Sequence, residues 1–176
     1  MLKFIALCAT VILGQVSAQN AEKQSNHSGK NNYSAADFSI DFPGDWQLNN
    51  SDSMGTTVIS LSPQQENDSF LENFNIIVMP IENGTTLKGL TDTALAMIGK
   101  VMNEFEFVER KTIQINGREC AKITYIFKQG LFKLKTNQYI ILRDKSAYLI
   151  TATFLTTTYN DFISINDDVI NTFKLK

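Results

Sequence analysis

The chain has 176 residues, of which 43% are hydrophobic and 19% charged, and its formal net charge is −2 at pH 7. This length suits one globular domain with one core. The mild acidic balance argues against a nucleic-acid-binding protein, which shows clustered basic residues, and against a polybasic attachment to membranes.

The first eighteen residues have the pattern of a secretory signal peptide. Lys3 provides a positive start, residues 4–13 form an apolar run, and residues 16–18 end in the small-x-small pattern that signal peptidases cut. The apolar run is shorter than the roughly 20 residues that span a membrane. We therefore predict cleavage between Ala18 and Gln19 and a soluble exported protein, periplasmic or secreted.

Residues 19–35 are polar and offer little apolar surface to bury. Such a composition predicts a flexible leader, so the folded domain is expected over residues 36–176. His27, the only histidine, falls in this leader. Because Cys8 falls in the signal peptide, Cys120 is the only thiol of the expected mature chain and no intrachain disulfide can form.

The domain begins with an expected strand over residues 38–42, where apolar and polar side chains alternate before a Pro-Gly pair. Trp46 follows and is expected to close one end of the core. Further strands are expected over residues 57–61 and 74–81, the second of them apolar enough to be a buried central strand.

The spacing of the apolar residues then changes from the alternation of strands to that of a helix. Apolar residues recur at helical spacing over residues 87–103, which predicts an amphipathic helix, with Thr91 and Asp92 as an alternative start. A meander follows, in which Asn116-Gly117 is the strongest hairpin signal. Its strands are expected over residues 107–115, 118–128, 131–143 and 147–155, and a second helix over residues 159–173.

This order predicts the α+β class, with an antiparallel sheet flanked by two main helices that cover apolar sheet surface. The two faces of such a sheet need not be covered equally. The residues expected in the core are Phe38, Phe42, Trp46, Ile77, Leu95, Ile98, Ile123, Tyr125, Phe127, Ile150 and Phe173.

Several motifs resemble the PsbP-like and DcrB-like proteins. Residues 38–46 run from a strand into Pro-x-x-Trp, and the Asn-Gly-Arg hairpin at 116–118, the strand at 148–153 and the apolar pair before Thr-Phe at 169–173 follow in that family's order. The resemblance implies a curved antiparallel sheet in an α/β/α sandwich and mostly exported bacterial members. It implies little about activity, and the metal-linked histidines of plant members have no counterpart in residues 36–176.

The residue types present argue against an enzyme. A nucleophile with a histidine base, or a histidine-based zinc site, needs an imidazole that the domain lacks. No Gly-rich phosphate loop occurs. We predict no catalytic residue, metal or cofactor. Carboxylate chemistry is the remaining alternative, and its candidates are Asp41 with Asp45, Asp167 with Asp168, and Glu104, Glu106 and Glu109.

Cys120 alternates with Lys122 on its expected strand, opposite the apolar face of Ala121 and Ile123. If that apolar face is the core, the thiol points outward near Arg118 and Lys122, where cations favour a reactive thiolate or a disulfide-linked homodimer. The alternative is a second covering helix that buries the thiol.

We therefore expect a non-enzymatic binding or accessory protein of the cell envelope, with a protein partner. Tyrosine suits an exposed binding surface because it combines apolar area with a polar tip. The candidates for that surface are Tyr125, Phe132, Tyr139 and Tyr148. A small-ligand or lipid carrier is the alternative, and it needs an apolar pocket of about 300 Å³ or more.

Overall fold

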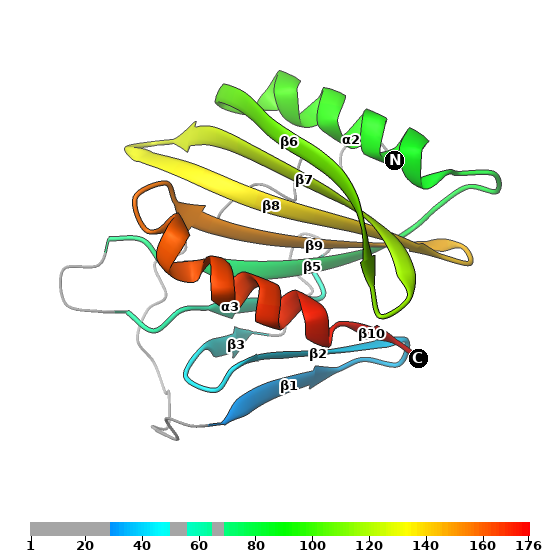
Figure 1. The fold of residues 1–176 in the computed structure, drawn as a ribbon, viewed down its shortest axis with the longest axis horizontal. Helices are drawn as coiled ribbons and strands as arrows, with labels where there is room; N and C mark the ends of the chain where they lie inside the picture. The colour runs from blue at the N-terminus through cyan, green and yellow to red at the C-terminus, as the bar shows by residue number, and fades with distance from the viewer. Residues whose placement is uncertain (1–28, 50–55, 65–68) are drawn as a thin grey trace.

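The computed structural model describes residues 29–49, 56–64 and 69–176. Within these residues, seven antiparallel strands form a large sheet in the order β3-β4-β5-β9-β8-β7-β6 (Figure 1). The expected meander forms half of it, because β6 to β9 follow one another along the chain. The strands are β3 (Gln47–Asn49), β4 (Val58–Leu61), β5 (Asn73–Pro80), β6 (Asn103–Ile115), β7 (Arg118–Gln129), β8 (Phe132–Arg143) and β9 (Ser146–Leu155).

A small antiparallel sheet lies on one side, with β2 between its two neighbours. Its first strand lies within residues 19–35, so the expectation that the flexible leader extends to residue 35 was wrong. That strand is polar and carries no hydrophobic alternation, but Asn31 Nδ2 donates to the carbonyl oxygens of Pro43 at 3.3 Å and Trp46 at 2.7 Å. The folded domain therefore includes residue 30. The three strands are β1 (Lys30–Ser34), β2 (Phe38–Pro43) and β10 (Lys174–Leu175).

Helices α2 (Leu87–Val101) and α3 (Tyr159–Thr172) cover opposite faces of the large sheet (Figure 1). Helix α2 begins after Thr86, whose hydroxyl accepts from the Gly89 amide at 3.1 Å and satisfies one of the free amides of the first turn. The alternative start at Thr91 is wrong. The α+β class with two main helices is confirmed.

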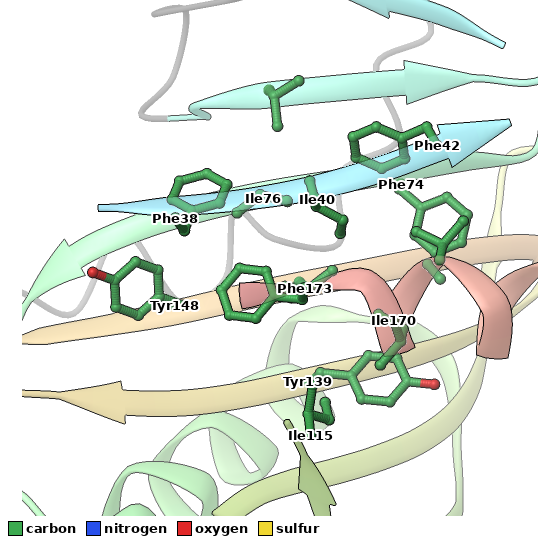
Figure 2. Close-up of a cluster of buried hydrophobic side chains, with 14 of the residues drawn as sticks. Phe38, Ile40, Phe42, Phe74, Ile76, Ile115, Tyr139, Tyr148, Ile170 and Phe173 are labelled. Carbon is green, nitrogen blue, oxygen red and sulfur yellow. The ribbon is translucent and has the colours of Figure 1, made fainter. Parts of the chain in front are cut away.

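The face under α3 and the small sheet carries an aromatic-rich cluster, the α3-side core. The Phe173 ring centroid lies 5.6 Å from that of Phe38 and 5.9 Å from that of Tyr148 (Figure 2). Strand β2 of the small sheet is thus packed against the end of α3. The buried members of the α3-side core are Phe38, Ile40, Phe42, Trp46, Val58, Phe74, Ile76, Ile115, Cys120, Tyr139, Ile141, Tyr148, Ile150, Ala152, Phe154, Val169, Ile170 and Phe173.

The opposite face carries the α2-side core, which α2 covers. Both faces of the central strands are therefore buried, and in β9 every residue from Ala147 to Phe154 is buried. Of the expected core residues only Leu95 is half-buried, and the others are buried. The buried members of this second core are Phe70, Ile77, Met79, Ala94, Ile98, Ala121, Ile123, Tyr125, Phe127, Leu134, Ile140, Ala147 and Leu149.

Candidate functional site

The four aromatic residues expected to form an exposed surface do not form one. Tyr125, Tyr139 and Tyr148 are 0%, 2% and 2% exposed, and Phe132 is half-buried with its ring 5.5 Å from that of Phe70. The expectation was wrong because covering layers close both faces of the sheet. Tyr139 and Tyr148 face the α3 side, whereas Tyr125 and Phe132 face the α2 side.

Two of these tyrosines use their hydroxyls inside the fold. Tyr139 Oη accepts from Asn166 Nδ2 at 2.7 Å, and Tyr148 Oη donates to Asp37 Oδ2 at 2.6 Å. Burial raises the pKa of Tyr139 above its usual value, and burial, helped by the bond to Asp37, raises the pKa of Tyr148 to about 12. These groups stay neutral and hold layers together.

Cys120 is fully buried in the α3-side core. Burial raises the pKa of its thiol to about 12, so thiolate is scarce at physiological pH. The outward-facing, reactive or dimer-forming thiol is therefore not what the structure shows. The alternative expectation, a buried thiol, is correct, because α3 and the small sheet cover the face that Cys120 shares with Lys122.

The candidate acidic pairs make no constellation. Asp41 accepts from Asn32 Nδ2 at 2.7 Å, whereas Asp45 is exposed in the next turn. Asp167 and Asp168 are both exposed on α3. In the part of the chain that the structure describes, no group of three or more His, Cys, Asp or Glu side chains is placed to hold a metal ion.

Exposed apolar side chains occur instead on the outermost strand of the large sheet and at the end of the helix beside it. Among the described residues, the exposed large hydrophobic side chains are Val101 (52%), Phe107 (48%), Val108 (41%) and Leu131 (96%). Phe107 and Val108 lie on β6, the outermost strand, and Val101 ends α2, which packs beside β6. We call Val101, Phe107 and Val108 the edge patch.

The backbone of β6 is irregular at the edge patch. The strand pairs with β7 on one side only, and its register shifts between Asn103 and Glu106 and again between Phe107 and Glu109. Val108 falls at the second shift and has no opposing residue on β7. Such bulges bend an outer strand and discourage unspecific pairing with other sheets. They also turn side chains outward.

Charged residues surround the edge patch. Glu104 lies 3.2 Å from Lys128, and Glu109 lies 2.6 Å from Lys111, whose hydrogen bond lowers the pKa of Glu109. Glu106, in contrast, makes no ion pair within the described residues. An apolar centre with a charged rim is the arrangement of many protein interfaces.

The sequence predicted a strand over residues 107–115 but not its position at the outer edge of the sheet, so the edge patch was missed. A usable signal was present: Glu104, Glu106 and Glu109 interrupt the strand with charges, as is typical of an edge strand. The three glutamates lie on β6 beside the residues of the edge patch.

Comparison with known proteins gives one family. A family model described as PsbP-like protein matches residues 7–175. A comparison with curated proteins gave no match.

Solved structures share the fold at low sequence identity. Cyanobacterial PsbP (CyanoP) from Synechocystis sp. PCC 6803 superposes with a TM-score of 0.64 at 14% identity, over 90% of this chain and 99% of that one. LpqN of Mycobacterium tuberculosis, described as involved in cell envelope biogenesis, gives 0.63 at 12%, over 86% and 92%. The Ran-binding protein Mog1p of Saccharomyces cerevisiae gives 0.59 at 8%, over 84% and 95%.

Proposed function

The chain belongs to the PsbP-like protein family, and from this premise we propose that it is an exported accessory protein of the cell envelope. It acts by binding another protein and not by catalysis. The edge patch, Val101, Phe107 and Val108, is the surface that binds this partner.

The exposure of three apolar side chains on or beside the outermost strand carries the proposal. Val101, Phe107 and Val108 are each more than two-fifths exposed. Covering apolar surface stabilises a complex by about 25 cal/mol per Å² before the costs of association are subtracted. A protein partner fits best, because the outer side of β6 offers unpaired backbone groups beside these side chains.

Two structural neighbours support this proposal. LpqN, which is described as involved in cell envelope biogenesis, and Mog1p, which is described as Ran-binding, have the same fold. They indicate that this scaffold can serve in an envelope and can bind a protein. In the described part of the chain, no helix combines the length and the hydropathy needed to cross a membrane.

Export rests on the signal-peptide pattern of residues 1–18, which lie outside the described residues. Amino-terminal sequencing of the protein purified from its native host tests it. A mature chain that begins near Gln19 supports export. A chain that keeps Met1, or that is extracted only by detergent, contradicts it.

The lipid-carrier alternative gains no support from the hollow near the carboxyl-terminal strand. Carriers of small ligands need an apolar pocket of about 300 Å³ or more. The hollow between the β6–β7 turn and β10 measures about 160 Å³. It can hold one small apolar group, which is less than such a carrier needs.

Recovery from the native envelope tests the proposed function. The tagged mature protein is isolated under gentle conditions, and mass spectrometry identifies the proteins and lipids that co-purify. A protein recovered in stoichiometric amount in every replicate supports the proposal. A bound lipid with no protein, or bare monomer, contradicts it.

Activity profiling tests the non-enzymatic part. Pure protein is assayed against panels of hydrolase and oxidoreductase substrates, and we expect no turnover. Turnover that disappears in Asp41→Asn or in Asp167→Asn would assign a carboxylate-dependent reaction and contradict the proposal.

A further inference from the structure

A second surface feature lies away from the edge patch, between the tip of the β6–β7 hairpin and strand β10. It is a hollow of about 160 Å³. Its buried lining consists of Ile115, Ile141 and Phe173, and Leu175 contributes a half-buried apolar side. The engineered cavity that holds one benzene molecule is of similar size, about 150 Å³. The hollow thus has room for one ring or one branched side chain.

The charged residues of this hollow are all cationic. Arg118 and Lys174 are part of its lining and are exposed, and no Asp or Glu belongs to the lining. Within the described residues, neither cation makes an ion pair. Arg118 shares its sheet face with Cys120, two residues further along β7, so its side chain lies on the side of α3 and β10. The site therefore favours an apolar ligand with a negative charge.

The backbone of β10 adds hydrogen-bonding groups to the hollow. Lys176 N donates to Asp37 O at 2.9 Å, which shows that the backbone groups of residue 176 face β2. Because these groups alternate along an antiparallel strand, the amide and carbonyl of Leu175 face away from β2. Phe173 O points the same way and accepts from Asn116 Nδ2 at 2.7 Å. The free edge of β10 therefore faces the hairpin tip.

We propose that this hollow binds the carboxyl-terminal residue of a partner polypeptide. The apolar side chain of that residue fills the space beside Phe173, and its carboxylate pairs with Arg118, with Lys174 adding positive potential. Its backbone hydrogen-bonds to the free edge at Leu175. A peptide uses all three features, whereas a free fatty acid would leave the backbone groups of Leu175 unused. The inference rests on the proposed function, since it requires a protein partner, but it uses a different surface.

Titration with short peptides tests the inference. The probes are N-acetylated hexapeptides that end in Phe with a free carboxylate, the same peptide as a carboxamide, and a version ending in Ser. Backbone amide NMR of the ¹⁵N-labelled mature protein reports binding. We expect the free acid ending in Phe to shift the amides of Leu175 and Arg118, and the carboxamide and Ser versions to bind about tenfold more weakly or worse.

A charge-matched pair of variants locates the binding. Arg118→Gln should weaken the free-acid peptide by about tenfold. Lys133→Gln removes the same charge from an exposed side chain at the opposite end of the β7–β8 pair, and it should leave the affinity unchanged. Both positions are exposed, so both variants should fold, and thermal melting checks this.

Three outcomes of the titrations would overturn the inference. One is equal binding of the acid and the carboxamide, and another is equal affinity in Arg118→Gln and Lys133→Gln. The third is binding of 3-phenylpropanoate as tight as that of the peptide, which would assign the hollow to free carboxylic acids. The proposed function fails separately, when wild-type protein recovers no partner from the envelope. If the partner is recovered equally well by Arg118→Gln, the accessory function stands and this inference falls.

Discussion

Helices α3 and α2 cover the two faces of one sheet, but different contacts hold them. On the α3 side, polar side chains of the sheet reach the helix: Asn166 Nδ2 donates to Tyr139 Oη at 2.7 Å, and Asn137 Nδ2 donates to Tyr159 Oη at 3.1 Å. These bonds are buried or partly buried and fix the position of α3 on the strands.

On the α2 side, the polar groups of the sheet bond to each other. Gln138 Nε2 donates to Thr151 Oγ1 at 3.4 Å within the sheet, and Gln138 Oε1 is buried without a partner. Helix α2 packs through apolar side chains, and its polar link to the sheet is the exposed ion pair of Asp92 with Arg110. Within the described residues, the α2 layer thus depends chiefly on apolar packing, and α2 ends at Val101 of the edge patch.

The largest expected effect is loss of stability when either core loses a ring. Phe173→Ala on the α3 side and Phe127→Ala on the α2 side should each lower the free energy of unfolding by about 3–5 kcal/mol, because each ring is buried. Urea denaturation measures this, with exposed Leu131→Ala as the control that should change little. Unchanged midpoints for both Phe variants would contradict the assignment of two cores.

Chemical labelling of Cys120 probes closure of the α3 side. Burial raises the thiol pKa to about 12, so thiolate is scarce near neutral pH, and burial also blocks access of the reagent. We expect iodoacetamide to label the unfolded protein in minutes and the folded protein at a rate set by unfolding. Rapid labelling of the native protein would show that this face is open.

The polar contacts should distinguish the two faces. Asn166→Ala leaves the buried Tyr139 hydroxyl without its partner and should cost about 1–3 kcal/mol. Gln138→Met removes one long hydrogen bond together with an unpaired buried oxygen, so its cost should be smaller. Thermal or urea unfolding of both variants measures the difference. A larger loss for Gln138→Met would reverse the comparison.

The smallest effect concerns the exposed link of α2. Hydrogen bonds from Lys88 and Arg110 lower the pKa of Asp92 below 3.8. The folded state therefore binds this proton less readily than the unfolded state, so the stabilisation is present above pH 3.8 and is lost as the pH falls through the lowered pKa. Asp92→Asn should be slightly less stable than wild type at pH 7, and the difference should disappear in acid. A difference that persists or grows in acid would contradict this.

Local sequence signals predicted most of the elements. The Asn116-Gly117 pair forms the expected hairpin, with φ of 47° and 76° that suit a tight turn. The helical periodicity that starts at Leu87 appears as α2. Strand β1 was not predicted because a short polar strand shows no alternation of apolar and polar residues. Its pairing with β2 is a tertiary contact, which the local sequence does not reveal.

Exposure could not be predicted in the same way. Alternation along β7 places Cys120 and Tyr125 on opposite faces, but it does not tell whether one face or both are covered. Burial of Tyr139 depends on α3, which follows it in the chain by a whole strand and a turn. The edge patch depends on the position of β6 at the end of the strand order, which no local pattern encodes.

The central claim is that function lies at the edge patch and not among the buried aromatic residues. Partner recovery from the native envelope with Phe107→Asp and Leu131→Asp tests it most directly, because both variants place the same charge on an exposed apolar position. With folding verified by thermal melting, we predict that Phe107→Asp reduces recovery about tenfold or more, as loss of an aromatic hot spot does, and that Leu131→Asp retains it. Full recovery with Phe107→Asp, or equal loss in both variants, would contradict the claim.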